Sequence, residues 1–425
     1  MNVIEKILAR AAGREEVSPG EFVVCDVDMT VLIDLQFTHG RLEDIVAVRD
    51  PGRVAIVMDH AVPAPGIREA AAGTAARQFA RWHGVSRFFD IGAHGIVHQV
   101  LAERGLALPG QVLACTDSHT CAAGALNAAA RGLGPAEIIQ ILCTGRVWYQ
   151  VPPTIRYELT GEKSPVISGK DIFLHIAGQY GDAANHAIEF GGPGLAGIAM
   201  NDRRTMATQG AEVSADFTVF PADDRCLAYV GEAAPEAEFS AVLPDADTRY
   251  ASVRQVPVTA VEPTVGLPGS VIRNTELVRD AAGTHVDQCF IGSCANGQLE
   301  DLEVAAAILA GRRVADGVRL IVTPASQRVY LEASRRGYLA TLVEAGAVVT
   351  NSTCGACFGY HMGVVGPGEV CLTASTRNFK GRMGSPDAEI YMASSATVAA
   401  SAVAGRICDP RDVLGEDGGS GDGGQ

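Results

Sequence analysis

Short runs of apolar, mostly β-branched residues alternate along the chain with Ala-rich stretches. In the first third of the chain this pattern predicts strands at 54–58 (VAIVM), 87–91 (RFFDI) and 111–116 (QVLACT). Such short runs between helical stretches are typical of parallel strands that helices cover on both faces. The pattern therefore predicts an α/β fold with mostly parallel sheets in α/β/α layers.

The Ala-rich stretches predict helices at 67–82 and 122–131. Glycines follow both, at positions 84 and 132, and glycine is the residue that most readily ends a helix in the left-handed conformation. A middle part opens near residue 150 with two prolines and the strand TIRYELTG, and it is richer in loops such as GGPG at 191–194.

The C-terminal third shows the alternation again. A Pro- and Gly-punctuated segment at 262–285 predicts a connector. After it we expect strands at 287–291, 318–322 and 347–350, a helix at 298–309, and a helix opened by Thr323 and Pro324. The expected domains are 1–149, 150–281 and 282–412, with a disordered Gly-rich tail at 413–425.

Charge and composition exclude several classes of function. The 425 residues carry 34 Lys and Arg against 49 Asp and Glu, a formal charge of -15. Such a chain repels nucleic-acid phosphates and anionic membranes, so we expect neither as a partner. It has neither a long uninterrupted apolar span nor a signal-peptide pattern, and its eleven cysteines are spread out. A cytoplasmic protein with reduced thiols is expected.

Reactive residues gather where predicted strands end, and ligands of α/β sheets bind at the carboxyl ends of the strands. Asp59 and His60 follow one strand, and His98 follows the next. Asp117, Ser118 and His119 follow a third strand, Cys294 and the Cys354–Cys357 pair follow strands of the last domain, and Arg377 and Arg382 follow the strand EVCLTAS.

The three thiols Cys294, Cys354 and Cys357 suggest a metal site in one domain. A closed zinc site with His361 as fourth ligand is one alternative. A thioredoxin-like pair is disfavoured, because a Gly-rich run follows the CxxC rather than a helix. An iron–sulfur cluster with three cysteine ligands leaves one iron open as a Lewis acid for a hydroxyl and a carboxylate.

The histidines and arginines suit acid–base work on an anion. His60 and His119 each have an Asp nearby in sequence, and a close carboxylate orients an imidazole for proton transfer. Glu189 is a further candidate carboxylate. Arg377 and Arg382 are candidates for a bidentate clamp on a di- or tricarboxylate, although surface arginines have no ligand in many proteins.

Taken together, these segments resemble the aconitase superfamily, in particular the branch with the large subunits of 3-isopropylmalate dehydratase and archaeal-type homoaconitase. The likeness covers almost the whole chain. It is carried by MDHAVPAP, GIVHQVL, TDSHT, AIEFGGPG, IGSCANGQLEDL, CGACFGYHMG and RNFKGRMG in this order.

The resemblance implies three aconitase-like domains around a 4Fe-4S cluster held by Cys294, Cys354 and Cys357. It implies a reversible hydro-lyase reaction that isomerises a 2-substituted malate, such as 2- or 3-isopropylmalate, through its alkene. The implied catalytic residues are Asp59, His60, His98, Asp117, His119 and Glu189, and the implied substrate contacts are Arg377, Arg382, Asn296 and Ser118.

The resemblance also implies a partner, because relatives with a complete active site have a further swivelling domain that is a separate small subunit in the split branch. Three positions depart from the family pattern: Ile33 stands in place of a histidine, Ala295 in place of a threonine and Thr376 in place of an asparagine. These departures leave open a second hypothesis, a non-catalytic or altered-specificity paralogue that serves as a binding or regulatory protein.

Overall fold

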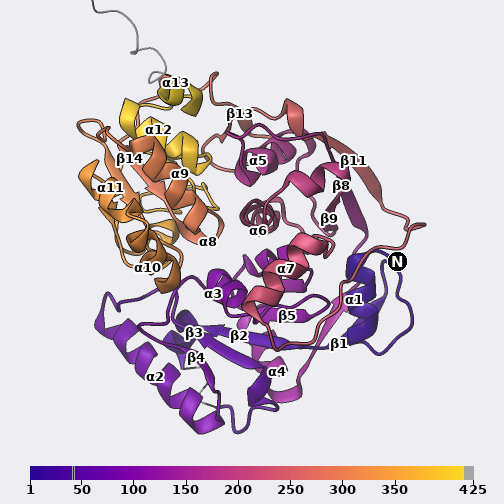
Figure 1. The fold of residues 1–425 in the computed structure, drawn as a ribbon. Coiled ribbons are helices and arrows are strands. Elements are labelled where there is room, and N and C mark those ends of the chain that lie inside the picture. The colour runs from indigo at the N-terminus through magenta and orange to yellow at the C-terminus, as the bar shows by residue number, and fades with distance from the viewer. Residues whose placement is uncertain (41, 43, 416–425) are drawn as a thin grey trace, which may run out of the picture. The chain divides into compact units, whose positions relative to one another are not determined.

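The chain divides into two compact units in the computed structural model, which describes residues 1–40, 42 and 44–415 (Figure 1). Unit 1 comprises Met1–Glu162 and Asp182–Thr259. Unit 2 comprises Lys163–Gly181 and the residues from Ala260 on. The segment at 163–181, which the sequence assigns to the middle of the chain, thus packs with the C-terminal part.

Unit 1 contains a five-stranded, all-parallel sheet of order β4-β3-β2-β5-β6. Alternate residues of its central strand enter two different cores: Leu32 packs with helix α2, and Val31 and Ile33 pack with helix α3. Burial of both faces explains why this strand has the nearly continuous apolar sequence MTVLI, in which Thr30 is the one polar residue. The elements are β2 (Met29–Ile33), β3 (Val54–Val57), α2 (Ile67–His83), β4 (Arg87–Phe89), α3 (Val97–Glu103), β5 (Val112–Cys115) and β6 (Ala129–Gly132).

Two smaller sheets complete unit 1. A four-stranded parallel sheet has the order β10-β9-β8-β11, and a two-stranded antiparallel ribbon pairs β1 with β7. The strands are β1 (Phe22–Asp26), β7 (Arg146–Gln150), β8 (Thr154–Thr160), β9 (Ala187–Gly191), β10 (Phe217–Val219) and β11 (Ser252–Pro257). The helices are α1 (Val3–Ala11), α4 (Pro135–Thr144), α6 (Met200–Gln209) and α7 (Asp224–Ala233).

Unit 2 is built on a seven-stranded sheet of order β13-β12-β18-β17-β14-β15-β16, parallel from β18 to β16. One face packs against helices α9 and α12, and the other packs against loops that contain Cys357 and Met383. Its strands are β12 (Thr264–Gly266), β13 (Thr275–Leu277), β14 (Gln288–Ile291), β15 (Arg319–Val322), β16 (Val348–Val349), β17 (Val370–Thr373) and β18 (Glu389–Met392). Its helices are α5 (Gly169–Tyr180), α8 (Ser293–Asn296), α9 (Leu299–Leu309), α10 (Gln327–Arg335), α11 (Tyr338–Glu344), α12 (Ser395–Ala404) and α13 (Pro410–Gly415).

The predicted strands and most predicted helices occur within a few residues of their expected ranges, but three expectations were wrong. The expected helix at 122–131 is a 3-10 turn, Thr120–Leu126, followed by β6. Gly124 explains the difference, because a Cβ there would lie 1.6 Å from the Thr218 carbonyl oxygen; close packing on β10 overrides the helix propensity of alanine. The connector contains β12 and β13, and α10 is capped by Ser326 rather than opened at Thr323.

The three larger sheets lie in successive thirds of the chain, as expected of three α/β segments, and the domain limits themselves remain a prediction. The third sheet starts earlier than residue 282, because β12 and β13 join it through antiparallel pairing. Of the tail expected to be disordered, residues 413–415 belong to α13, and residues 416–425 lie outside the described residues.

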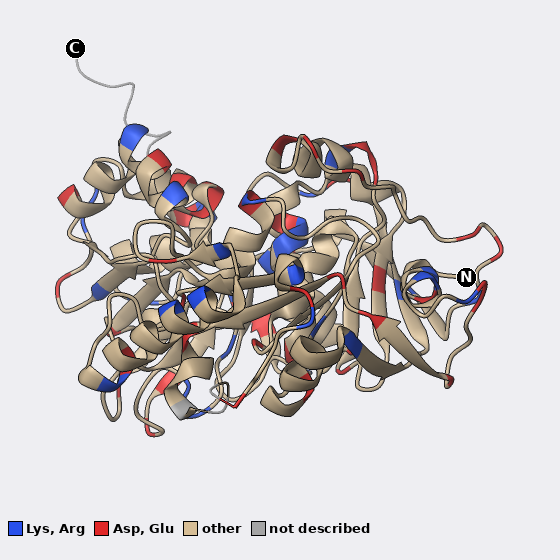
Figure 2. Cartoon of the chain, turned by 90° about the horizontal axis from the view of Figure 1, so that it is seen from below, with Lys and Arg blue, Asp and Glu red and all other residues tan. Residues whose placement is uncertain are grey.

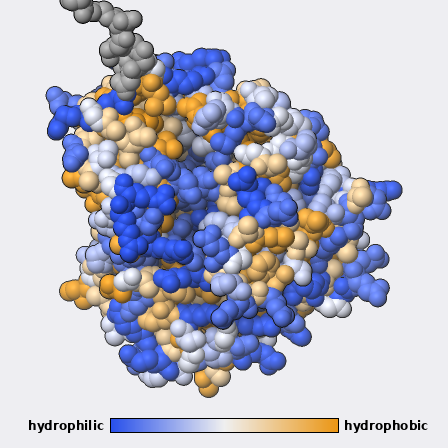
Figure 3. Space-filling model, viewed as in Figure 1, coloured by the Kyte–Doolittle hydropathy of each residue, from blue (hydrophilic) through white to orange (hydrophobic). Residues whose placement is uncertain are grey.

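Charged residues of both signs are interspersed along the chain (Figure 2). The face in Figure 3 likewise mixes hydrophilic and hydrophobic residues. Among the described residues, no helix has both the length and the apolar character needed to cross a membrane.

Candidate active site

The histidines and carboxylates of unit 1 meet at the carboxyl edge of the five-stranded sheet. Asp34 follows β2, Asp59 and His60 follow β3, and Asp117 follows β5. Because β3 and β5 both pair with β2 in parallel, these strand ends lie next to each other. Gly132 at the end of β6 allows the loop after β5 to pack closely against it, because a Cβ at this position would lie 2.5 Å from the Asp117 carbonyl oxygen.

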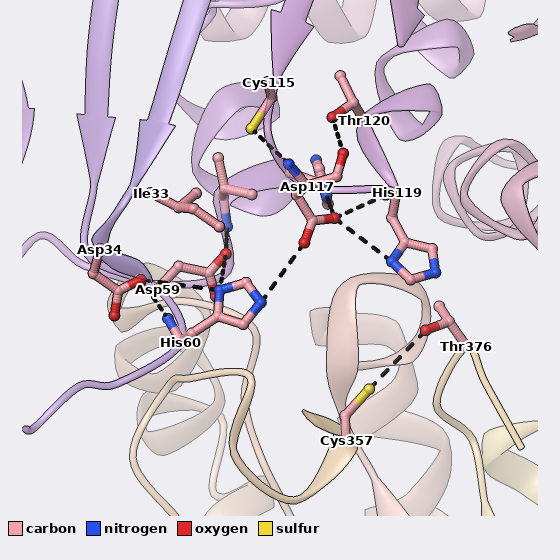
Figure 4. Close-up of polar contacts among 12 residues, drawn as sticks. Ile33, Asp34, Asp59, His60, Cys115, Asp117, His119, Thr120, Cys357 and Thr376 are labelled. Atoms are coloured by element: carbon pink, nitrogen blue, oxygen red, sulfur yellow. Dashed lines mark hydrogen bonds and ion pairs between the residues drawn. The ribbon is translucent and has the colours of Figure 1, made fainter. Parts of the chain in front are cut away.

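Asp117 is the centre of this group (Figure 4). Its Oδ1 lies 2.8 Å from His98 Nε2 and accepts the backbone N–H of His119 at 2.8 Å. Its Oδ2 lies 3.6 Å from His60 Nε2. The side chain of Asp117 thus contacts all three histidines that the sequence singled out, each of which is at least 95% buried.

A second layer of carboxylates surrounds His60. Its Nδ1 lies 3.6 Å from Asp59 Oδ2 and 3.9 Å from Asp34 Oδ1. Asp59 also accepts the backbone N–H of Val97 at 2.9 Å, and so fixes the start of α3, the helix of His98. Asp34 accepts the backbone N–H groups of His60 and Ala61. The loop that carries His60 is therefore held from two neighbouring strand ends.

Burial and hydrogen bonding set the protonation of this group. Burial raises the pKa of Asp59 to about 7. Burial also favours a raised pKa for Asp117, but hydrogen bonds from His119 and His98 outweigh it and hold the pKa of this carboxyl well below its usual value. Burial lowers the pKa of His98 despite its bond to Asp117. At neutral pH, Asp117 is ionised and His98 is neutral.

The expectation that Glu189 partners the histidines needs correction. Glu189 is fully buried on β9, where its carboxylate accepts hydrogen bonds from Arg156, from the Tyr250 hydroxyl at 2.7 Å and from the backbone N–H of Val3. The carboxylate that does contact a histidine is Glu212, whose Oε1 lies 2.9 Å from His119 Nε2.

Sequence reasoning missed Glu212 because it follows α6 in a short 3-10 turn and follows no strand. Asp34 directly follows a strand, so the rule that selected Asp59 and Asp117 could also have selected Asp34. Ile33 beside it is buried in the core with Val31 and Val57, so its side chain adds packing and no polar contact.

The three thiols lie in unit 2, again after parallel strands. Cys294 follows β14, and the Cys354–Cys357 pair follows β16. Ser293, directly before Cys294, has a φ of 81°, a left-handed conformation that is costly for a residue other than glycine. Cys354 and Cys357 share one tight turn, in which the Cys357 N–H donates to the Cys354 carbonyl at 3.2 Å. Backbone strain of this kind gathers at functional sites.

Two polar groups lie near the Cys357 sulfur. Arg382 Nη2 donates to it at 3.8 Å. Thr376 Oγ1 lies 4.0 Å from it (Figure 4). The Arg382 guanidinium also stacks over the rings of Phe358 and Phe379. Thr376, which stands where the family pattern has an asparagine, therefore also places a polar group at this position. Within residues 1–40, 42 and 44–415, no three His, Cys, Asp or Glu side chains are grouped so as to hold one metal ion.

The remaining predicted contact residues lie in loops and a short helix that follow parallel strands. Arg377 follows β17 and is partly buried. Asn296 closes α8 and donates from Nδ2 to Asp301 at 2.9 Å, while its buried Oδ1 has no hydrogen-bond partner among the described residues. Ser118 is exposed beside Asp117 in unit 1.

Comparisons with known proteins identify the family of the chain. Residues 38–405 match the model of the Aconitase family (aconitate hydratase). The chain is 62% identical to the 3-isopropylmalate dehydratase large subunit of Mycolicibacterium smegmatis, over 97% of this chain and 98% of the relative. It is 40% identical to the protein of the same name from Moorella thermoacetica, over 97% of this chain and 99% of the relative.

A solved structure supports the fold independently of close sequence likeness. The holo form of aconitase X from Thermococcus kodakaraensis superposes with a TM-score of 0.50 at 12% identity, over 91% of this chain and 93% of that one. This likeness bears on the fold alone. With a family match over most of its length and relatives covered almost end to end, the chain belongs to the aconitase family.

Proposed function

We propose that this chain is the large subunit of an iron–sulfur hydro-lyase that interconverts 2- and 3-isopropylmalate through the dehydrated alkene. The observation that carries the proposal is the 62% identity to a 3-isopropylmalate dehydratase large subunit over nearly the full length of both chains. The group of histidines and carboxylates around Asp117 supports it, because dehydration needs acid–base groups next to the substrate.

The thiols of unit 2 fit a 4Fe-4S cluster as ligands. Cys294, Cys354 and Cys357 would hold it. In such a cluster each thiolate binds a different iron, so the three sulfurs do not have to converge on a single metal ion. Three buried polar oxygens beside these loops, on Asn296, Ser352 and Ser375, have no hydrogen-bond partner among the described residues. When bound, such a cluster supplies a Lewis acid that polarises the substrate hydroxyl and a carboxylate without net redox change.

In the proposed reaction, Asp117 orients the acid–base groups. An ionised carboxylate only accepts hydrogen bonds, so the proton of neutral His98 lies on Nε2, and Nδ1 is left as the acceptor. His98 Nδ1 is buried and has no hydrogen-bond partner among the described residues. We assign the transfer of protons to and from the hydroxyl to His60, His98 and His119, with Glu212 orienting His119 in the place first given to Glu189.

Binding of the substrate carboxylates is assigned to Arg377 and Arg382, with Asn296 and Ser118 as further polar contacts. Guanidinium groups pair with carboxylates in a bidentate manner, which suits a malate derivative. A separate small subunit is proposed to complete the site, because both relatives are named as large subunits. A cytoplasmic location is proposed on the eleven cysteines, all described and none in a disulfide.

The test is purification without oxygen followed by reconstitution. We expect a brown protein with broad absorbance near ~400 nm and about four irons per chain. Mixed with a small subunit of this branch, it should raise alkene absorbance from 2-isopropylmalate. A colourless protein with zinc, or a brown one without turnover on any 2-substituted malate, would overturn the proposal.

A further inference from the structure

Lys170 is a fully buried lysine to which the proposed chemistry assigns no role. It is the second residue of α5, the helix that joins unit 2 from the middle of the sequence, and its relative exposure is 0%. Its ammonium donates to the Ser375 carbonyl oxygen at 2.8 Å and lies 3.9 Å from Met392 Sδ. Lys170 therefore reaches the carboxyl ends of β17 and β18 from a helix 205 residues away in sequence.

This position is unfavourable for a lysine on local grounds. Transfer of an ammonium group from water to the protein interior is costly even when it is hydrogen-bonded. The first turn of a helix is also the positive end of its dipole, which repels a cation. Departures from local preference of this kind are expected where function requires them.

What Lys170 holds is the segment that carries the proposed substrate contacts. Ser375 is followed directly by Thr376, whose hydroxyl lies 4.0 Å from the Cys357 sulfur, and by Arg377. The Ser375 hydroxyl is buried without a hydrogen-bond partner among the described residues, so its side chain does not anchor the turn. A charge-assisted bond to the Ser375 carbonyl fixes the backbone two residues before Arg377.

We propose that Lys170 is a positioning residue that sets the turn at Ser375 so that Arg377 binds a substrate carboxylate. The inference rests on the proposed function, since it takes the carboxylate of a malate derivative as the group that Arg377 binds. An arginine that holds a carboxylate throughout the reaction contributes equally to ground-state and transition-state binding. Its misplacement therefore raises KM and leaves kcat nearly unchanged.

The test uses the cluster-loaded large subunit reconstituted with its small subunit, with 2-isopropylmalate as the probe. Lys170→Met should raise KM at least about tenfold, the effect of one charge-assisted hydrogen bond, with kcat within about threefold of the wild type. Iron content and visible absorbance should stay at wild-type values. Lys170→Arg, which keeps a cationic donor, should recover most of the loss in KM.

Lys163→Met is the matched control, because Lys163 lies just before the same helix and also donates to a backbone carbonyl, that of Ile167, at 2.7 Å. It should leave KM unchanged. Should the Lys170→Met protein not fold, Lys170→Gln supplies the neutral variant. An unchanged KM, or parallel loss of kcat, iron and thermal stability, would overturn the inference. A wild-type protein without iron or turnover would instead contradict the proposed function.

Discussion

The substitution Asp117→Asn tests the acid–base group most directly. Its Oδ1 is 2.8 Å from both His98 Nε2 and the His119 backbone nitrogen, and asparagine can keep an oxygen there while losing the charge. Charge-assisted hydrogen bonds contribute roughly 1.5–3 kcal/mol and neutral bonds roughly 0.5–1.5 kcal/mol. Two bonds that each lose their charge should together cost about 2–3 kcal/mol.

The effect on turnover should be larger than the effect on stability. Without the charge on Asp117, nothing in this contact requires the proton of His98 to lie on Nε2, so the acceptor at Nδ1 is no longer enforced. Loss of a positioned acid–base group typically costs about 100- to 10,000-fold. We therefore expect a drop in kcat within this range, measured as alkene absorbance from 2-isopropylmalate with the small subunit present.

A matched control is Asp90→Asn in the same unit. Asp90 pairs with Arg77 through two hydrogen bonds of 2.6 and 2.8 Å and also has a lowered pKa, because bonds from Arg77 outweigh its burial. It should lose stability without losing turnover. Turnover of the Asp117→Asn protein within about threefold of the wild type, at full iron content, would refute the assignment of Asp117 as the orienting group.

Three further predictions concern the other residues of the two units. Cys357→Ser should abolish iron retention and the brown colour, whereas Cys143→Ser, at an exposed position, should not; equal iron content in both would contradict the ligand assignment. Glu212→Gln should lower kcat by roughly 100-fold without loss of iron, because it removes the charge next to His119; an unaltered kcat would return Glu212 to a structural role. Since burial raises the pKa of Asp59 to about 7, the folded state binds its proton more tightly than the unfolded state, and the contribution of Asp59 to stability must fall as pH rises toward 7. The free energy of unfolding of the wild type relative to Asp59→Asn, from urea denaturation, should fall by roughly 2–3 kcal/mol between pH 5 and 7, and a pH-independent difference would show that Asp59 is ionised throughout.

The sequence by itself determined the fold class and indicated that most of the candidate catalytic residues lie at the carboxyl edges of the sheets. Apolar runs such as VAIVM mark buried parallel strands because burial on both faces excludes polar residues. In a parallel sheet the carboxyl ends share one edge, so residues that directly follow strands are predicted to meet. Asp59, His60 and Asp117 follow this rule: Asp59 Oδ2 lies 3.6 Å from His60 Nδ1, and Asp117 Oδ2 lies 3.6 Å from His60 Nε2.

Only the tertiary structure decided which carboxylate meets which histidine. Glu189 follows the motif pattern yet pairs with Arg156 and Tyr250, while Glu212, from a turn without a motif, contacts His119. Lys170 reaches the turn at Ser375 across 205 residues of sequence. These pairings depend on how helices and sheets pack. Packing is set by contacts between segments far apart in the chain, and the local periodicity of the sequence carries no information on such contacts.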